Sequence, residues 1–323
     1  MSQHLAATNR RGMQSVLGES ALTGFAIFCS LRPETSFWLA GQALLGLTLF
    51  HWFVIEHSCG HEAQFRSRGL NYWVGHLASI FSLIPFFPWV FVHRQHHRWS
   101  GWVDRDPTTR SAELTPPPAR VQRVIDLCWR LWIPIFSLVF ATGEFWNPAR
   151  VDISAPARSQ RRRTRLSMGV IALAHLGLLL GLGSHYGRLF GVSFLVYLSI
   201  ADPTLLGQHA GIPHGRAGSR DVRPLDLSAQ DDFARTLLFP AWIQRSVFLN
   251  FNLHGLHHVH PRVPHYRAHE LTFEARHACA GLTWLWEAKR RPASELLFGA
   301  RTIDADAAPL KRQTAPDVKS GAV

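Results

Sequence analysis

Three clusters of histidine are the residues in this sequence that are best suited to chemistry. Their members are His57 and His61 in HSCGH, His93, His96 and His97 in HRQHH, and His254, His257 and His258 in HGLHH. Residues that are three or four positions apart share one face of a helix, so each cluster directs its imidazole rings to one side. Neutral imidazole is a good ligand for iron, zinc and copper. The spacing therefore predicts helical metal-binding motifs.

The number of these histidines exceeds what one metal ion needs. A further candidate ligand, His209 in GQHAGIPH, follows an apolar run, and His214 is the alternative to it. One metal ion takes about four to six ligands, so eight or nine imidazoles predict two metal ions. Structural zinc more often uses cysteine, and none of the four cysteines has ligand spacing. A two-metal site with only nitrogen ligands indicates redox or oxygen chemistry.

Apolar segments lie between these clusters and predict helices that cross a membrane. Runs without Asp, Glu, Lys or Arg cover residues 35–55, 69–92 and 166–187, and weaker runs cover 20–31 and 189–201. A helix needs about 20 apolar residues to cross a bilayer. Arginines gather before the first run and before residue 166, and basic ends of this kind stay in the cytoplasm. We therefore expect two helical hairpins, with spans at about 15–31, 35–55, 166–185 and 189–206.

Two other apolar runs are predicted to lie at the membrane surface. Residues 69–92 contain Pro85 and Pro88, which interrupt a helix. The clusters on both sides of this run must reach one site, so we expect an interfacial or re-entrant segment that does not cross the membrane. The run 131–143, with tryptophans around it, is also expected to be interfacial.

These elements predict an all-α integral membrane protein. We expect residues 1–300 to form one domain of about four transmembrane helices in two hairpins, with interfacial helices. Residues 56–165 and 207–300 would form a cytoplasmic, histidine-rich cap, and the polar tail 301–323 would be disordered.

The composition agrees with a membrane protein and argues against a nucleic acid partner. Charged residues make up 17% of the chain, against about 25% in ordinary soluble domains. The formal net charge is +12, but most of the positive residues are arginines that lie between apolar runs. Because no DNA- or RNA-binding motif accompanies this charge, we expect no binding to nucleic acid.

Acidic residues near the clusters are candidates to orient the ligands. A metal-bound histidine usually donates its second N–H group to a carboxylate or a carbonyl. The candidates are Glu56, Glu62, Asp104, Asp106 and Asp202. Asp106 precedes a proline, so capping or ending a helix is the alternative interpretation of that residue.

The three clusters and their order resemble the membrane fatty acid desaturase superfamily, and bacterial acyl-lipid-type members in particular. HSCGH, HRQHH and HGLHH match its three histidine boxes, and HRWSGWVDRDPT and HHVHPRVPHY are similar to the sequences around the second and third boxes. The resemblance covers about residues 35–270. It implies a non-haem di-iron centre, whose two Fe ions are held by the eight box histidines with His209 as a further ligand. It also implies that O2 and two electrons remove two hydrogens from an acyl chain.

The expected function is therefore a membrane-bound, oxygen-dependent fatty acyl desaturase with a lipid-like substrate. We expect it in the bacterial inner membrane, with the active site facing the cytoplasm. No His-Pro-Gly-Gly haem motif occurs in the sequence, so the electrons are expected from a separate ferredoxin or cytochrome b5. Two alternatives stay open: a hydroxylase or ketolase of a carotenoid, sterol or alkane on the same scaffold, and a zinc-storing membrane protein without catalysis.

Overall fold

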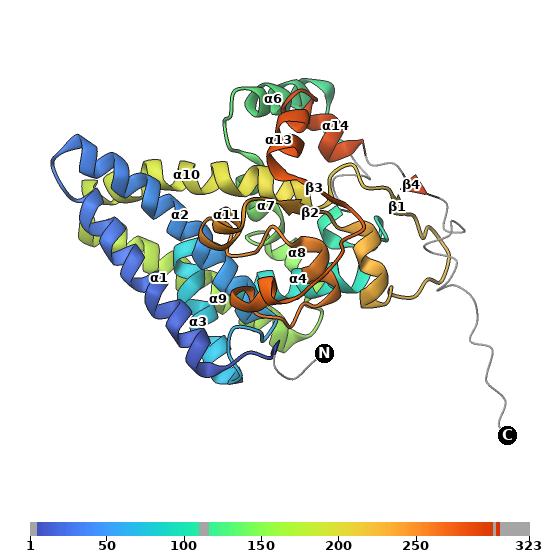
Figure 1. Cartoon of the computed structure of the whole chain (residues 1–323), viewed down its shortest axis with the longest axis horizontal. Helices are drawn as coiled ribbons and strands as arrows, with labels where there is room; N and C mark the ends of the chain where they lie inside the picture. The colour runs from blue at the N-terminus through green and yellow to red at the C-terminus, as the bar shows by residue number, and fades with distance from the viewer. Residues whose placement is uncertain (1–4, 110–115, 300–301, 304–323) are drawn as a thin grey trace.

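The structure, a computed structural model, describes residues 5–109, 116–299 and 302–303. Helices and the loops between them make up most of these residues, which confirms the all-α prediction. The long helices are α1 (Asn9–Ser30), α2 (Thr35–Gly60), α3 (Arg68–Ser82), α9 (Arg158–Leu182) and α10 (Ser184–His209). They extend to one end of the molecule, and the shorter elements gather at the other end (Figure 1).

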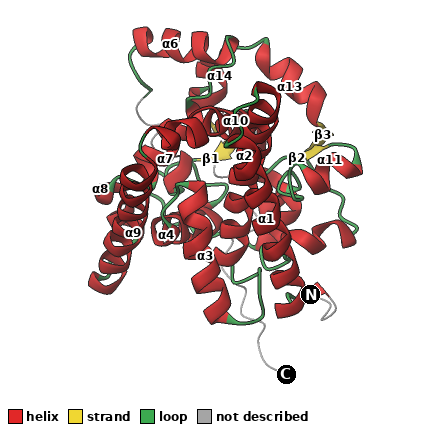
Figure 2. Ribbon diagram, turned by 90° about the vertical axis from the view of Figure 1, so that its left-hand side faces the viewer, coloured by secondary structure: helices red, strands yellow, loops and turns green. Residues whose placement is uncertain are grey.

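Two antiparallel helical pairs build this bundle. A short turn joins α1 to α2, and Gly183 alone joins α9 to α10. Gly183 has a φ of +54°, in the left-handed region that glycine adopts without steric cost. α2 packs against α1, α3 and α10, and Figure 2 shows α2 and α10 close to end-on in the middle of the bundle.

Three helices in the described part of the chain are long and apolar enough to cross a membrane, namely α2, α9 and α10. A fourth crossing is added if the bent pair of α3 and α4 (Phe86–Trp99) forms one span. The protein is thus an all-α integral membrane protein. α1 does not belong to this set, because polar residues interrupt its apolar sequence, and the span predicted over residues 15–31 stays a prediction.

The most polar of these residues in α1, Glu19, is buried against α2. Its carboxylate Oε2 lies 3.0 Å from His51 Nδ1, and His51 Nε2 lies 3.2 Å from the carbonyl oxygen of Val247. An acid between apolar helices is costly unless it is paired. The contact with His51 therefore explains how α1 can carry Glu19 on the face that packs against α2.

α3 and α4 form one sharply bent segment. The angle between them is 100°, and the break falls at residues 83–85, where Leu83 has a φ of +61°. Pro85 has no N–H group and disfavours a helical conformation at the residue before it, so one continuous helix cannot form. The second half of α4 returns to the end of α2, because His61 Nε2 and His93 Nε2 lie 2.9 Å apart. The bend near Pro85 agrees with an interrupted segment, and the prediction that this segment does not cross the membrane stays a prediction.

The cap consists of short helices and two small pairs of parallel strands. Its helices besides α4 are α6 (Ala119–Arg130), α7 (Phe136–Glu144), α8 (Pro148–Ser154), α11 (Ala241–Ser246), α12 (His254–Val259), α13 (Gly281–Lys289) and α14 (Ala293–Phe298), with the 3-10 helices η2 (Leu227–Phe233) and η3 (His265–Glu270). The strand pairs are β1 (His214–Gly215) with β4 (Thr302–Ile303), and β2 (Thr236–Leu238) with β3 (Ala278–Ala280). Of the tail predicted to be disordered, residues 301 and 304–323 lie outside the described residues.

The predicted interfacial run 131–143 contains most of α7. This helix has nine residues, which is well below the length of about 20 that a crossing needs. The carboxylate of Asp202 on α10 accepts hydrogen bonds from the first backbone amides of α7, those of Phe136 at 3.1 Å and Ser137 at 2.7 Å. Asp202 thus ties the start of α7 to a candidate spanning helix.

Candidate metal centre

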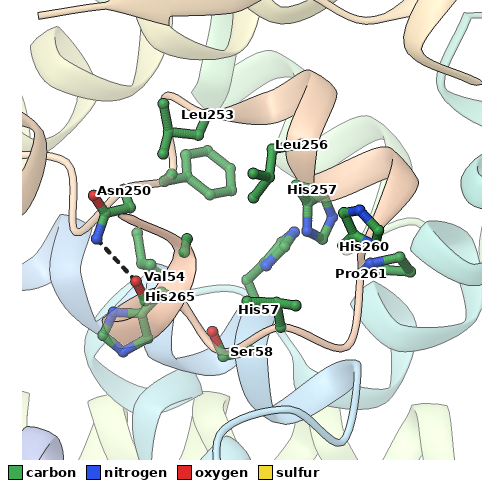
Figure 3. A pocket seen from close by; sticks show the side chains of 13 residues that line it. Val54, His57, Ser58, Asn250, Leu253, Leu256, His257, His260, Pro261 and His265 are labelled. Atoms are coloured by element: carbon green, nitrogen blue, oxygen red, sulfur yellow. Dashed lines mark hydrogen bonds between the residues drawn. The ribbon is translucent and has the colours of Figure 1, made fainter. Parts of the chain in front are cut away.

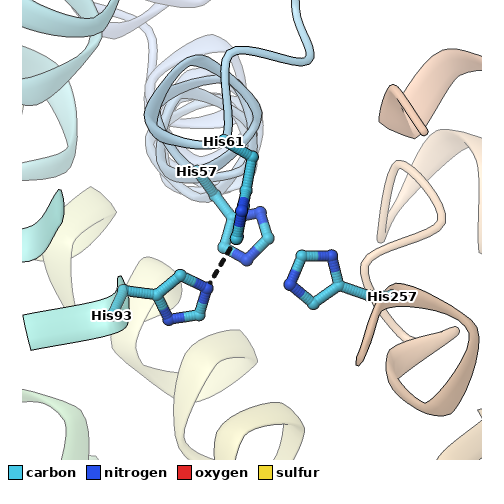
Figure 4. Close-up of side chains that lie close together, drawn as sticks. All are labelled: His57, His61, His93 and His257. Atoms are coloured by element: carbon cyan, nitrogen blue, oxygen red, sulfur yellow. Dashed lines mark hydrogen bonds between the residues drawn. The ribbon is translucent and has the colours of Figure 1, made fainter. Parts of the chain in front are cut away.

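All nine histidines that the sequence singles out lie together where α2, α4, α10 and α12 meet. Eight of them form two groups of four, and the ligand nitrogens in each group lie within 4.8 Å of one another. The first group contains His57, His61, His93 and His257, and the second contains His96, His209, His254 and His258. Figure 4 shows the first group, with rings from α2, α4 and α12 turned toward one point.

The Nε2 atoms of the second group are closely spaced. His254 Nε2 lies 2.8 Å from His209 Nε2 and 3.0 Å from His258 Nε2. His96 Nε2 lies 3.3 Å from His258 Nε2. Three helices supply these rings, since His96 belongs to α4, His209 ends α10, and the other two belong to α12.

The ninth histidine, His97, borders the first group. Its Nε2 lies 3.1 Å from His93 Nε2 and 3.0 Å from His257 Nε2. His57 Nε2, which also belongs to this group, is buried and has no hydrogen-bond partner among the described residues. The first group therefore contains a buried nitrogen that still needs a partner.

Close packing between α2 and α4 brings the first two histidine clusters together. Gly60 of HSCGH faces the indole of Trp89, and a Cβ atom at Gly60 would collide with that ring. Trp89 is buried and stacks on His93, with ring centroids 4.4 Å apart and an angle of 25° between the planes. The absence of a side chain at Gly60 thus allows α4 to place His93 against α2.

The proton positions on two rings of the second group follow from their partners. His96 Nδ1 lies 2.7 Å from Asp106 Oδ2, and His209 Nδ1 lies 2.8 Å from the carbonyl oxygen of Phe233. A carboxylate and a carbonyl only accept hydrogen bonds, so each Nδ1 carries the proton. Each Nε2 then presents a lone pair to the group.

His258 has the same arrangement. Its Nδ1 lies 3.1 Å from Gln230 Oε1, while Gln230 Nε2 donates to the carbonyl oxygen of His97 at 2.8 Å. His258 therefore donates through Nδ1 and also presents a lone pair at Nε2. Lone pairs that meet without a proton between them repel one another, and a shared cation removes this repulsion. The residues of the second group thus fit a metal ion that accepts nitrogen ligands.

Burial keeps the imidazoles of the third cluster neutral. It lowers the pKa of His257 to about 3, and His96 adds a smaller effect in the same direction. Burial also holds the pKa of His254 and of His258 well below the ordinary value, with contributions from the neighbouring histidines. Since neutral imidazole is the form that binds metal, these rings are available as ligands at neutral pH.

Asp106 both orients a cluster histidine and accepts hydrogen bonds in the way that a helix cap does, which are the two roles that its sequence context allowed. Its Oδ2 orients His96, and its Oδ1 accepts hydrogen bonds from Thr108 N at 2.9 Å and Thr108 Oγ1 at 2.8 Å. Burial alone would raise the pKa of the Asp106 carboxyl, but His96 and Thr108 outweigh this effect and hold that pKa below its ordinary range. The carboxylate therefore stays ionised beside His96.

The other four predicted acids have different partners among the described residues. Glu56 binds Ser82, Glu62 pairs with Arg68, Asp104 accepts hydrogen bonds from the amides of Ala217 and Gly218, and Asp202 caps α7. The prediction that they orient cluster histidines is therefore wrong in this geometry. Gln230, which sequence reasoning missed, takes such a role, and no motif in its surroundings LSAQDDF signals it.

The geometry also decides between His209 and His214. His214 Nδ1 lies 2.8 Å from the carbonyl oxygen of Ile212, and its ring centroid lies 6.4 Å from that of His209. His214 belongs to neither group of four in the described residues, whereas His209 belongs to the second. His209 is thus the better candidate ligand.

Comparison with known proteins gives a consistent result. A family model described as fatty acid desaturase matches residues 35–289, a range that contains all nine histidines. It covers all three candidate spans, α2, α9 and α10, and all four helices that supply the two groups.

Several plant enzymes are similar to most of this chain. A chloroplastic omega-3 fatty acid desaturase from Glycine max is 26% identical over 280 residues, which are 79% of this chain and 58% of that protein. An sn-2 acyl-lipid omega-3 desaturase (ferredoxin) from Helianthus annuus is 25% identical over 288 residues, 82% and 62% of the two chains. An acyl-lipid omega-3 desaturase (cytochrome b5) from the endoplasmic reticulum of Arabidopsis thaliana is 24% identical over 280 residues, 80% and 68% of the two. The chain thus spans 58% to 68% of the length of these relatives.

Proposed function

The chain belongs to the fatty acid desaturase family, and we propose that it is a membrane-bound, oxygen-dependent desaturase that inserts a C=C bond into a fatty acyl chain. The observation that carries this proposal is the pair of four-histidine groups at one end of the spanning helices. Two adjacent nitrogen-lined sites suit a chemistry that needs two redox-active metal ions. Their position beside the membrane suits a substrate that comes from the lipid.

The cofactor in this proposal is a pair of iron ions. The first would be held by His57, His61, His93 and His257, with His97 beside them, and the second by His96, His209, His254 and His258. When bound, the two irons would activate O2 so that it can abstract hydrogen from an unactivated methylene group. Non-haem iron accepts imidazole ligands readily, and all the groups in both sites are imidazoles.

The overall reaction balances with two electrons and two protons from outside. Two hydrogens leave adjacent carbons of the acyl chain, a C=C bond forms, and O2 is reduced to two molecules of water. The chain's own residues hold the ligands in place for this reaction. Asp106, Gln230 and the Phe233 carbonyl each fix the Nδ1 proton of one ligand, so that its Nε2 faces the metal.

The proposed partners are an acyl-lipid substrate and a separate electron carrier. The names of the Helianthus annuus and Arabidopsis thaliana relatives contain acyl-lipid, and they specify ferredoxin and cytochrome b5 respectively. We propose a carrier of one of these two types for this chain. Its net charge of +12 favours the approach of an acidic carrier protein.

The proposed location is the bacterial inner membrane, with the metal centre on the cytoplasmic side. α9 and α10 are antiparallel, so the start of α9 and the end of α10 lie at the same end of the bundle. The start of α9 carries a cluster of arginines from Arg158 to Arg165, and the end of α10 carries His209. Because arginine-rich ends stay in the cytoplasm, this arrangement supports a cytoplasmic metal centre.

Lipid profiling of a host that expresses the chain tests the proposal. New double bonds in acyl chains are expected, and the purified protein should contain about two irons per chain, the number that eight to nine imidazoles can serve. His258→Ala should abolish the new double bonds. His269→Ala, a histidine outside both groups, is the matched control and should leave them unchanged. A product that gains oxygen without new unsaturation would reject desaturation in favour of hydroxylation.

A further inference from the structure

A set of apolar side chains is exposed on the part of the cap that α6 and α13 form. Each of them is at least 45% exposed, and together we call them the α6–α13 face: Val121, Val124, Leu127, Leu131, Trp132, Ile133, Leu282 and Trp286. The first three belong to α6, the next three follow it directly, and the last two belong to α13. Contiguous apolar patches mark interaction sites, whereas single exposed apolar residues do not.

α6 presents one side to the protein and another to the outside. Trp129 points inward, since it is buried and its Nε1 donates to the carbonyl oxygen of Ala288 at 3.0 Å. Asp126 also points inward, because its Oδ1 accepts a hydrogen bond from Ser294 N at 2.8 Å. The exposed valines and leucine of α6 recur every three residues on a different side. Figure 2 shows α6 lying crosswise to α2 and α10, as a helix in the plane of a membrane surface does.

Lys289 connects the exposed residues of the two helices. Its Nζ lies 3.7 Å from the ring centroids of both Trp129 and Trp132, and it donates to the carbonyl oxygen of Trp129 at 2.6 Å. Trp286 precedes Lys289 by three positions on α13, so the two share one side of that helix. The exposed indoles of Trp132 and Trp286 therefore both adjoin Lys289, and the face continues from α6 to α13.

The α6–α13 face adjoins the end of a candidate spanning helix. Trp129 and Ala288 pack in one buried cluster with Leu206, which lies in the last turn of α10. Tryptophan is enriched where a protein meets the boundary between membrane and water, and Trp132 and Trp286 are both exposed beside this end of α10. The position of the face thus favours the membrane surface as its partner.

The α6–α13 face is separate from the metal centre. A cavity beside His57 and His257 is enclosed by α2 and the segment from Asn250 to Ala268 (Figure 3). No residue of the face is among the described residues that line this cavity, and none belongs to the two histidine groups. A partner at this face therefore contacts the cap outside the site of the proposed reaction.

Basic side chains accompany the apolar ones and indicate which lipids fit. Arg120, Arg123 and Arg130 are exposed on α6. Directly after α13, the guanidinium carbon of Arg290 lies 4.8 Å from the ring centroid of Trp286. Arginines beside an apolar helix face suit anionic lipids, because their long side chains reach the phosphates while the apolar residues enter the acyl boundary. A second copy of the chain fits less well, since its net charge of +12 would bring like charges together.

We propose that the α6–α13 face lies in the membrane surface beside the end of α10 and binds anionic phospholipids there. Its apolar side chains enter the boundary of the acyl chains, and the arginines of α6 contact the lipid phosphates. The proposal extends the predicted interfacial run of residues 131–143 to two further helices. It does not depend on the proposed desaturation, because no histidine of the centre takes part.

Spin labelling of the full chain in lipid vesicles tests this contact. Cys128 and Cys279, the two cysteines that are not fully buried, are first replaced by serine. A nitroxide is then attached to Val124→Cys, and Arg123→Cys, an exposed position on another side of α6, is the matched control. In vesicles of phosphatidylcholine and phosphatidylglycerol, O2 from the bilayer should reach the label at position 124, and a water-soluble nickel chelate should not. The label at position 123 should show the reverse.

The charge dependence tests the choice of anionic lipid. Each basic residue near an anionic surface contributes about a fivefold preference for it. In vesicles with phosphatidylglycerol, Arg130→Gln should therefore raise the access of the chelate to the label at position 124, by up to about fivefold. In phosphatidylcholine alone the same substitution should change little. A melting temperature equal to that of the unlabelled protein verifies that each variant is folded.

Three results would overturn the proposal. Equal access of the chelate to both labels would show that the face lies in water. Exclusion of both O2 and the chelate from position 124 would show that protein covers it, such as a second copy of the chain. Equal shielding with and without phosphatidylglycerol would reject anionic lipid as the partner. The labels report immersion whether or not the protein makes double bonds, so a failure of the proposed function is distinguished from a failure of this inference.

Discussion

Replacing Asp106 with asparagine should release the metal ion of the second group and leave the fold intact. Both carboxylate oxygens of Asp106 accept hydrogen bonds, Oδ2 from His96 and Oδ1 from Thr108. Asparagine offers one oxygen and one NH2 group, so one of these donors must face the NH2 group. If that donor is His96, its ring has to accept at Nδ1 and carry its proton on Nε2. Nε2 is the atom that faces the other three ligands, so the ring can then no longer bind the metal.

The magnitude of this effect follows from the contacts. Loss of a residue that orients a metal ligand weakens metal binding by about 10- to 100-fold, which corresponds to about 1.4–2.8 kcal/mol. A hydrogen bond to a charged group contributes about 1.5–3 kcal/mol, which is the same range. The Asp106 carboxylate is 1% exposed and lies 2.7 Å from His96, so water cannot replace it easily. We therefore expect a value near the upper end of the range.

The assay is the iron content per chain after dialysis against a chelator. At a chelator strength that leaves wild type with about two irons, Asp106→Asn should retain about one, because only the second group depends on His96. Asp104→Asn is the matched control, since that carboxylate binds the backbone amides of Ala217 and Gly218 and no cluster histidine. Equal resistance to the chelator in wild type and Asp106→Asn would refute the assigned role of Asp106.

Three other changes test the rest of the site. Gly60→Ala should force the Trp89 indole away from α2. It should lower the free energy of unfolding by about 1–3 kcal/mol and cause a loss of iron from the first group. Unchanged iron content and melting temperature would contradict this packing. Gln230→Leu should leave His258 Nδ1 and the His97 carbonyl without their partner. Each unpaired buried group should lower the free energy of unfolding by about 1–3 kcal/mol. A melting temperature equal to that of wild type would exclude the contact. In the metal-free protein, burial lowers the pKa of His257 to about 3, so the unfolded chain binds more protons than the folded chain between about pH 6.5 and pH 3. The free energy of unfolding should therefore fall as the pH falls through this window, and thermal unfolding that does not change from pH 7 to pH 5 would be inconsistent with a neutral His257.

The sequence predicted the features that depend on residue spacing. The nine histidines, the bend near Pro85 and the helical class all follow from local periodicity, from proline chemistry or from the family resemblance. The partners that orient the ligands were harder to predict, because they depend on contacts between distant segments. Asp106 and Glu56 are both close in sequence to a cluster, but only Asp106 contacts a cluster histidine, since Glu56 faces Ser82. Gln230 lies 28 positions from the histidine that it binds, and no spacing rule connects the two.

The division of each cluster between the two groups has a simple helical explanation. In HRQHH, His93 belongs to the first group and His97, four positions later, borders that group. His96, three positions from His93, belongs to the second group. On a helix, positions i and i+4 lie nearly above one another, and position i+3 is displaced to the other side of that line. A helix with this motif can therefore present imidazoles to two neighbouring groups, the two proposed metal sites.

HGLHH follows the same rule with the two groups exchanged. His254 and His258 belong to the second group, and His257, at the third position after His254, belongs to the first. α4 and α12 thus each contribute to both groups. HSCGH lacks a histidine at the third position, and both of its histidines belong to the first group. His209 on α10 then supplies the ligand that the second group would otherwise lack, which explains why three clusters alone do not complete the centre.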